Sequence, residues 1–441
     1  MTRHRRVLAL ALALGLGMSP WLATGCDAAP STAGPQATWH GGVSAMFETR
    51  CAGCHRSGGI GPFALDTYDD ARTWAAAAVG AIAGGRMPPW PPDPECRPLH
   101  AERRVTPDEL QRLRDWIDAG HPLGDPKHAY VATTAATHGL GAADLVLSPN
   151  GPYASPDDVA DDYHCFVLDH AFEADAWIRM LEVDPGQDAT VHHVILFRVP
   201  AEGVAEVEAR DFAEPGEGYT CFGAPGGGVP DTLGGWLPGT VVDPYPHGVA
   251  MPVPAGSRIV MQVHYNLSVT REPDPGTSVK LWLADEPPVL SVDVVLLADP
   301  SIVIPPGEPA SQHISTHVNT TDTPWVVFGV SAHMHLLGTG IRMDALHSDG
   351  TEACLLDIPE WAFEWQQPYA FRPGDLAIIA PGEQVRLTCG YNNSAANQPV
   401  VGGEQRTPVT VTWGDGTYDE MCLGHLVLLR PNPNGGLRPA P

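Results

Sequence analysis

Glycine and proline interrupt this chain throughout, with 47 and 45 residues respectively among 441. This richness favours turn-dense β structure over a helical bundle. Neither a GxGxxG loop nor a Walker-type loop is present, which argues against a nucleotide-binding α/β enzyme. Beyond about residue 129, short β-branched runs alternate with turn residues and predict antiparallel sandwiches. These runs are Val191–Phe197, Arg258–Val263, Val292–Leu297, Val326–Val330, Gln384–Leu387 and Val409–Trp413.

The charge balance excludes two classes of partner. Asp and Glu number 52 against 25 Lys and Arg, a formal charge of −27. Nucleic acid and anionic membrane surfaces both need clustered basic charge, so neither is expected as the main partner. Hydrophobic residues make up 43% of the chain and charged residues 17%, which predicts a packed globular protein.

The N-terminus has the features of an export signal. Basic residues precede an apolar run from Val7 to about Leu16, which is too short to span a bilayer. The signal ends near Ala23-Thr24-Gly25-Cys26, which resembles a lipoprotein cleavage box with Cys26 as the lipidated residue. Plain secretion and an uncleaved anchor are the alternatives, since Ala23 replaces the usual Leu. We therefore expect an exported, periplasmic or cell-envelope protein that meets the membrane only through a lipid anchor.

The cysteine count predicts disulfides. Nine cysteines are present, of which Cys26 belongs to the signal and Cys51 and Cys54 to the motif described next. An even remainder in an exported protein indicates three disulfides, although six cysteines allow 15 connectivities. The remaining six are Cys96, Cys165, Cys221, Cys354, Cys389 and Cys422.

The sequence Cys51-Ala-Gly-Cys54-His55 is the attachment signature of a c-type haem. Two thiols one helical turn apart can bind the haem vinyl groups, and His55 would be the proximal iron ligand. A redox CxxC pair or a zinc half-site is the alternative interpretation. By elimination, Met87 in a Pro-rich loop is the expected sixth ligand, which favours electron transfer over oxygen binding. If Met87 only packs its loop, His100 or His121 would take that place.

A helix is predicted after this motif. Thr106 provides a cap, Pro107 begins the first turn, and Gly120 ends the helix. A helix of this kind that packs against the CxxCH segment is typical of small class-I-like cytochromes c. We therefore expect a small all-α cytochrome c domain over about 85 residues, ahead of two mainly antiparallel, jelly-roll-like β domains.

A set of histidines and one methionine lies within the β-rich part. His333 and His335 are two residues apart, so on a strand they share a face and can chelate one ion. His192 and His193 would point to opposite faces of a regular strand, so shared ligation requires a twist or a bulge there. Imidazoles with a single thioether suit copper, particularly Cu(I), better than zinc. The remaining members of the set are His264 and Met421.

Five sequence blocks resemble the copper type II, ascorbate-dependent monooxygenases, the family of peptidylglycine α-hydroxylating and dopamine β-monooxygenases. The resemblance covers roughly residues 142–430. Its blocks are Val-His192-His193-Val-Ile-Leu-Phe, Gln-Val-His264-Tyr, His333-Met-His335-Leu-Leu-Gly, Tyr391-Asn-Asn-Ser394 and Gly414-Asp-Gly-Thr-Tyr-Asp-Glu-Met421-Cys422.

The resemblance implies two coppers that face one another across a wet cleft, and one disulfide. An electron-transfer copper would be bound by His192, His193 and His264. The oxygen-activating, catalytic copper would be bound by His333, His335 and Met421. The implied disulfide joins Cys389 to Cys422. The pairing of the other four cysteines stays open, with Cys165–Cys221 and Cys96–Cys354 favoured.

Two departures from the peptide-amidating branch bear on the substrate. Ser331 stands where that branch has an arginine that would clamp a substrate carboxylate. Leu423 and His425 replace an asparagine and a tyrosine. A carboxylate-terminated peptide is therefore not the expected substrate. His425 either lines the pocket or is a structural histidine.

The predicted organisation is a signal peptide (1–26), a linker (27–39), the cytochrome c domain (40–126), a linker (127–141), two copper-binding β domains (142–286 and 287–432) and a tail (433–441). The predicted function is hydroxylation of a C–H bond of a small exported substrate with O2. Electrons would come from an ascorbate-like reductant or a redox protein, through the fused haem. The alternatives are an exported redox or copper-binding protein without oxygenase activity, and an electron carrier whose β domains only dock a partner. The sequence names neither the substrate, the physiological donor nor the oligomeric state.

Overall fold

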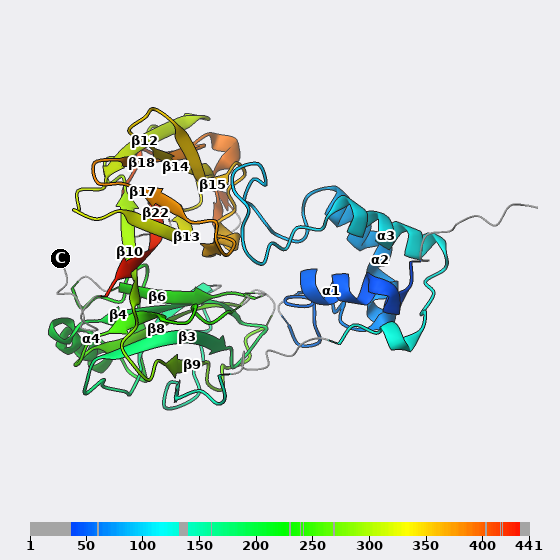
Figure 1. The fold of residues 1–441 in the computed structure, drawn as a ribbon, viewed down its shortest axis with the longest axis horizontal. Coiled ribbons are helices and arrows are strands. Elements are labelled where there is room, and N and C mark those ends of the chain that lie inside the picture. Colours follow the sequence, from blue (N-terminus) through cyan, green and yellow to red (C-terminus); the bar gives the residue numbers. More distant parts are fainter. Residues whose placement is uncertain are drawn as a thin grey trace, which may run out of the picture. The chain divides into compact units, whose positions relative to one another are not determined.

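The computed structural model describes residues 37–59, 61–131, 140–159, 161–228, 231–238, 240, 242–267, 270–401, 404–414, 416 and 418–432. The predicted signal peptide, the lipidation site Cys26 and the tail 433–441 lie outside these residues. The path of the chain through its helices and strands is drawn in Figure 1.

The N-terminal part of the described chain carries short helices. Helix α3 begins as the sequence predicts, because Thr106 and Glu109 form a reciprocal capping box and Pro107 occupies the first turn. Trp116 from α3 packs against Trp39 and Phe47 in a small hydrophobic cluster. The helices are η1 (Trp39–Val43), α1 (Ser44–Arg50), α2 (Tyr68–Ala83), α3 (Pro107–Asp118) and η2 (Pro126–His128).

The predicted fold class is wrong in placing an all-α domain ahead of two separate β domains. The described chain is mostly β-sheet with four α-helices, and the fourth, α4 (Ala201–Ala213), lies among the strands. Between α2 and α3 the chain runs without helix over residues 86–105, here called the strap. The strap is rich in proline, which lacks the amide donor that a helix needs.

The strap pairs with distant strands instead of closing a helical domain. Leu99 forms a β-bridge with Phe371, and Cys96 is disulfide-bonded to Cys354. Arg97 Nη1 lies 3.3 Å from an Asp375 carboxylate oxygen. These contacts tie the segment between α2 and α3 to the C-terminal strands.

The first β-sandwich packs two sheets around one hydrophobic core. A five-stranded antiparallel sheet has the order β5-β2-β8-β4-β6, and its core residues include Phe166, Leu196 and Met261. Strands β1, β9, β3 and β7 supply the opposite wall, with Ile178 and Leu281 in the core. The bounds are β1 (Leu145–Leu147), β2 (Asp161–Val167), β3 (Ala176–Asp184), β4 (Val191–Val199), β5 (Tyr219–Thr220), β6 (Asp231–Trp236), β7 (Val249–Val253), β8 (Arg258–Asn266) and β9 (Ser278–Leu283).

The second β-sandwich has its own core. A four-stranded sheet, β12-β18-β14-β15, packs against strands β10, β22, β13, β16 and β17 around residues such as Val327, Met343 and Leu426. The bounds are β10 (Leu290–Ala298), β11 (Val303–Ile304), β12 (Ser311–Val318), β13 (Trp325–His333), β14 (Gly338–Leu346), β15 (Glu352–Ile358), η3 (Phe363–Trp365), β16 (Tyr369–Ala370), β17 (Ala377–Ile379), β18 (Gln384–Tyr391), η4 (Ala395–Asn397), β19 (Val400–Val401), β20 (Glu404–Gln405), β21 (Val411–Thr412) and β22 (Leu423–Pro431).

One sheet runs through both sandwiches. Strand β7 pairs in parallel with β10 at Val249–Leu290 and Ala250–Ser291, which joins the two walls into nine strands. The predicted boundary between the two β domains, after residue 286, lies just before β10. The domain boundaries given above remain a prediction.

Three disulfides are present: Cys96–Cys354, Cys165–Cys221 and Cys389–Cys422. They are the pairs favoured from the sequence. Structural disulfides persist in oxidising compartments, so these bonds indicate an exported protein. None of the helices in the described segments is both long and apolar enough to cross a bilayer.

Candidate metal centres

A β-bulge brings His192 and His193 to the same site. The pairing of β4 with β8 shifts register between Val191, which faces Tyr265, and His193, which faces His264. A bulge inserts one unpaired residue and re-aims its side chain, so the strict alternation of a strand no longer separates the two rings. The bulge that shared ligation by His192 and His193 requires is therefore present.

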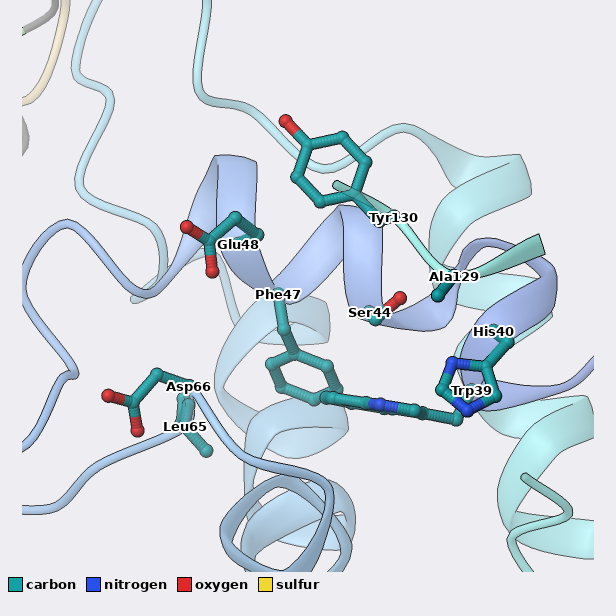
Figure 2. A pocket seen from close by; sticks show the side chains of 9 residues that line it. All are labelled: Trp39, His40, Ser44, Phe47, Glu48, Leu65, Asp66, Ala129 and Tyr130. Atoms are coloured by element: carbon teal, nitrogen blue, oxygen red, sulfur yellow. The ribbon is translucent and has the colours of Figure 1, made fainter. Parts of the chain in front are cut away.

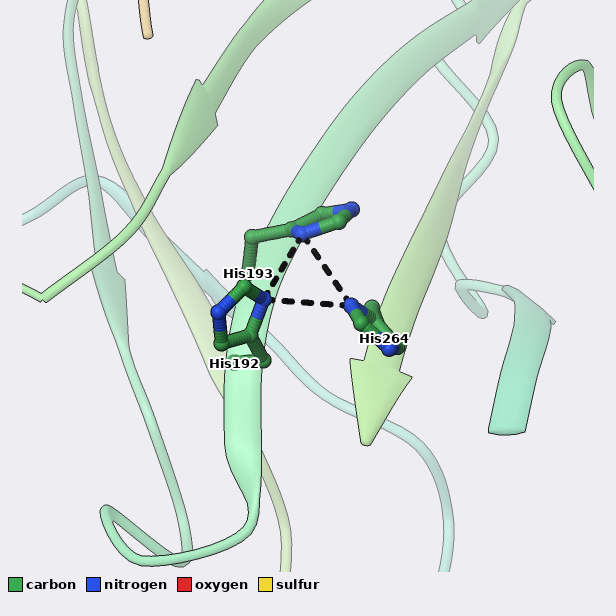
Figure 3. Close-up of side chains that lie close together, drawn as sticks. All are labelled: His192, His193 and His264. Atoms are coloured by element: carbon green, nitrogen blue, oxygen red, sulfur yellow. Dashed lines mark hydrogen bonds between the residues drawn. The ribbon is translucent and has the colours of Figure 1, made fainter. Parts of the chain in front are cut away.

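The three imidazoles converge on one point. The Nδ1 atom of His192 lies 3.3 Å from Nδ1 of His193 and 3.1 Å from Nδ1 of His264, and the last two are 3.3 Å apart. Figure 3 shows one nitrogen of each ring facing a common centre. The centre of such a triangle is about 1.9 Å from each nitrogen, close to the ~2.0–2.1 Å of a metal–imidazole bond. The cluster fits a single metal ion.

Neighbours of His264 fix its orientation. Its Nε2 donates to an Asp161 carboxylate oxygen at 2.9 Å, which leaves the Nδ1 lone pair directed at the cluster centre. The hydrogen bond from His264 lowers the pKa of Asp161 below its usual value. The ring of Tyr163 stacks on His264 at 4.1 Å with an interplanar angle of 4°. A carboxylate behind a histidine is a common support for a metal ligand.

The second candidate centre lies where β13 ends. His333 is the last residue of β13 and His335 follows just beyond it, with ring centroids 4.9 Å apart. Nδ1 of His333 faces Gln366 Oε1 at 2.5 Å, and Nδ1 of His335 faces the Asp419 carbonyl oxygen at 3.0 Å. In both rings the Nδ1 atom is directed at a protein acceptor, which turns the opposite, Nε2 edge away from that acceptor.

Met421 is held beside these rings by its neighbours. The Tyr391 hydroxyl donates to the Met421 carbonyl at 2.9 Å, and the adjacent Cys422 is bonded to Cys389 on β18. The buried Glu420 carboxylate accepts the backbone N–H groups of His335 and Leu337. Met421 itself is 8% exposed.

Burial disfavours the charged form of several of these imidazoles, so their pKa values are lowered. It lowers the pKa of His192 to about 4 and of His333 to about 3, and it holds that of His193 well below its usual value. The neighbouring imidazoles lower these pKa values further. His425 has its pKa lowered to about 4 by burial alone. Neutral imidazole is the form that binds metal ions.

A cavity of about 390 Å³ connects the two centres. Its wall includes His193 from the three-histidine cluster and His333, His335 and Met421 from the second centre. The same cavity is lined by Ser331 and His425, both singled out in the sequence. One cavity therefore reaches ligands of both candidate sites.

The haem prediction gains no support from the described residues. Cys51 and Cys54 form no disulfide, and burial raises the pKa of the Cys51 thiol to about 12. Met87 is 37% exposed. A second hollow, of about 180 Å³, lies beside Phe47 and Tyr130 (Figure 2), and it is lined by neither His55 nor Met87.

Three supporting residues were missed by the sequence reasoning. Glu420 stands within the Asp-Glu-Met-Cys block, but nothing in that pattern indicates that it binds the turn after β13. Asp161 and Gln366 lie 103 and 33 residues from the histidines that they contact. Such partners are set by strand pairing and carry no local signal.

Replacing Asp161 tests the support of the three-histidine cluster. We expect Asp161→Ala to weaken metal binding at this cluster about 10- to 100-fold, because His264 loses the acceptor that fixes its tautomer. Competition titration of copper against a chelator measures the change. Asp169→Ala is the control, since the Asp169 side chain is 80% exposed. An affinity equal to that of the control would contradict the supporting role.

A comparison with known families finds a match to about the last third of the chain. Residues 291–432 match the model of the copper type II ascorbate-dependent monooxygenase family, C-terminal domain. This segment contains His333, His335 and Met421, whereas the three-histidine cluster and residues 40–126 lie outside it. That family is copper-dependent, and imidazole and thioether donors are of the kind that suits copper.

Other comparisons add little. None of the curated proteins matches the chain. The infectious bursal disease virus VP2 subviral particle is similar at 12% identity over 67% of this chain and 74% of that one, with a TM-score of 0.18. A protein from Eubacterium rectale, described as secreted, is similar at 10% identity over 62% and 70%, with a TM-score of 0.17. At these scores neither likeness carries an inference about this chain.

Proposed function

We propose that this protein is an exported copper monooxygenase that hydroxylates a C–H bond of a small organic substrate. The observation that carries the proposal is one cavity whose lining includes His193 from the three-histidine cluster and His333, His335 and Met421 from the second centre. The last three residues lie within the segment that matches the family. His192, His193 and His264 would hold one copper ion, and His333, His335 and Met421 the other. The predicted lipid anchor at Cys26 would hold the protein at the cell envelope.

The overall reaction sets what the site has to supply. Converting R–H and O2 into R–OH and water consumes two electrons and two protons. Copper, when bound, supplies one-electron redox chemistry toward O2. The soft thioether of Met421 favours the Cu(I) state, which the imidazoles alone favour less.

The protein residues orient the ligands and shape the cavity. Asp161 accepts a hydrogen bond from Nε2 of His264, and Gln366 Oε1 accepts one from Nδ1 of His333. In each ring the opposite nitrogen is then the atom that would bind the metal. Phe222 and Phe363 flank His335, with ring centroids 6.4 and 6.1 Å away. These rings exclude water from one side of the candidate catalytic centre.

The electron source is proposed in two parts. The matching family uses ascorbate, so an ascorbate-like reductant or an external redox protein would reduce the coppers. We also propose that Cys51, Cys54 and His55 attach a c-type haem. His55 Nδ1 contacts the Phe63 carbonyl oxygen at 3.0 Å, which fits a ring that offers Nε2 to iron. Met87 stays the predicted sixth ligand.

Removing one attachment thiol tests the haem. We expect Cys51→Ser, expressed with a cytochrome c maturation system, to lose the double thioether link and most covalent haem, because one of the two vinyl groups has no partner. Intact-protein mass spectrometry and a pyridine haemochrome spectrum measure the haem content. Wild-type protein that carries no haem under the same conditions would contradict the assignment.

Copper and oxygen measurements test the main proposal. We expect two coppers per chain, and product increased by one oxygen atom together with O2 uptake when reduced protein receives a substrate. Metal analysis, an oxygen electrode and mass spectrometry give these three readouts. Two bound coppers without coupled O2 uptake would favour the alternative, an exported redox or copper-binding protein. Zinc in both sites would reject the proposal.

A further inference from the structure

One polar pair in the cavity has no part in the proposed metal centres. Ser331 on β13 and His425 on β22 are directly opposite across the two strands, and Ser331 Oγ lies 3.1 Å from His425 Nδ1. Both residues line the cavity. Within the part of the chain that the structure describes, the other imidazole nitrogen of His425 has no hydrogen-bond partner.

Strand alternation places this pair next to the second candidate centre. Ser331 and His333 are two apart on β13 and so share a face, and His333 is opposite Leu423 on β22. The Ser331–His425 row is thus one strand repeat, about 7 Å, from the His333–Leu423 row. Leu296 on β10 lies opposite His425 and continues the Ser331–His425 row onto a third strand.

The cavity carries no formal charge in its described lining. No Asp, Glu, Lys or Arg is among the described residues that line it, whereas Phe222, Trp236 and Phe363 are. In the metal-free protein, a carboxylate or ammonium group entering this cavity would lose hydration without gaining a charged partner, which is costly. An aromatic or aliphatic group would gain by leaving water.

We infer that the substrate is an uncharged, largely apolar molecule with one hydroxyl group, which the Ser331–His425 pair binds. This inference rests on the proposed function and names the substrate class of the same site. A hydroxyl group both donates and accepts, so it matches the second nitrogen of His425 in either tautomer. With the hydroxyl group bound there, the carbon chain or ring extends about 7 Å along the sheet toward His333, where the C–H bond is oxidised.

Four probes that share one ethyl-substituted ring isolate the recognised group. They are 4-ethylphenol, ethylbenzene, 4-ethylbenzoate and 4-ethylbenzylamine, which at pH 7 are a neutral phenol, a hydrocarbon, an anion and a cation. Equilibrium dialysis against the metal-free protein measures their binding without copper or O2. We expect 4-ethylphenol to bind at least about tenfold more tightly than either charged probe. Equal binding of a charged probe and the phenol would overturn the inference.

Two variants assign the preference to the pair. We expect His425→Phe to reduce the preference for 4-ethylphenol over ethylbenzene about five- to tenfold, the value of one hydrogen bond, and Ser331→Ala, which removes the contact that orients the His425 ring, to reduce it less. Ethylbenzene binding should stay unchanged in Ser331→Ala. Ser315→Ala is the control, because Ser315 forms the same contact with His317 at 3.0 Å on β12. A preference that survives in both variants would overturn the role of the pair.

The same probes separate this inference from the proposed function. Copper-loaded, reduced protein is then assayed with each probe for a product increased by one oxygen atom. If 4-ethylphenol binds selectively in dialysis but no probe yields a product, the monooxygenase proposal is rejected and the binding role of Ser331 and His425 is retained. Product formed from all four probes at similar rates, without selectivity in dialysis, would reject the substrate class alone.

Discussion

Met421→Ala is expected to lower the rate of substrate hydroxylation on the order of a hundredfold, while copper content falls much less. His333 and His335 still offer two imidazoles, which can hold an ion weakly. The thioether that favours Cu(I) is lost, and with it the state able to react with O2. Rates from product formation and copper from metal analysis, on the same preparation, measure the two effects.

Met421→Leu distinguishes the loss of the sulfur ligand from the loss of side-chain volume. Met421 is 8% exposed, so Met421→Ala also leaves a void. Leucine restores most of the volume without sulfur, so we expect it to recover thermal stability and not activity. Activity close to wild type in Met421→Leu would show that the sulfur is no ligand.

The strands that carry the candidate site could be predicted from local sequence. Val191–Phe197 and Arg258–Val263 fall within β4 and β8, because β-branched runs bounded by turn residues need no distant information. The bulge at His192 was required by the chemistry of shared ligation. Its position came only from the pairing of β4 with β8.

The errors lie where distant segments meet. The strap was assigned to a helical domain, but its prolines favour extended backbone, and Leu99 pairs with Phe371 more than 270 residues away. The shared nine-stranded sheet depends on two parallel residue pairs between β7 and β10. Neither contact leaves a periodic pattern in the sequence, so neither could be predicted.

Glu420→Ala is expected to lower the free energy of unfolding by about 4 kcal/mol, since each buried donor left without a partner costs about 1–3 kcal/mol. The Glu420 carboxylate is fully buried and accepts the backbone N–H groups of His335 and Leu337 at 2.9 and 2.6 Å. Burial raises the pKa of this carboxyl group to about 7. Alanine removes both acceptors and leaves both N–H groups inside the protein.

The same carboxylate connects stability to the candidate catalytic centre. Glu420 accepts hydrogen bonds from the turn that carries His335, and it is the residue just before Met421. Its loss should therefore disturb this centre more than the three-histidine cluster on β4 and β8. We therefore expect Glu420→Gln, which keeps one acceptor oxygen, to lose less stability than Glu420→Ala and to retain the copper of the three-histidine cluster. Urea unfolding and copper analysis measure both effects, and Glu360→Ala at an exposed position is the control. If Glu420→Ala unfolds at the urea concentration of the control, the two backbone hydrogen bonds do not hold the turn, and another contact must position His335 beside Met421.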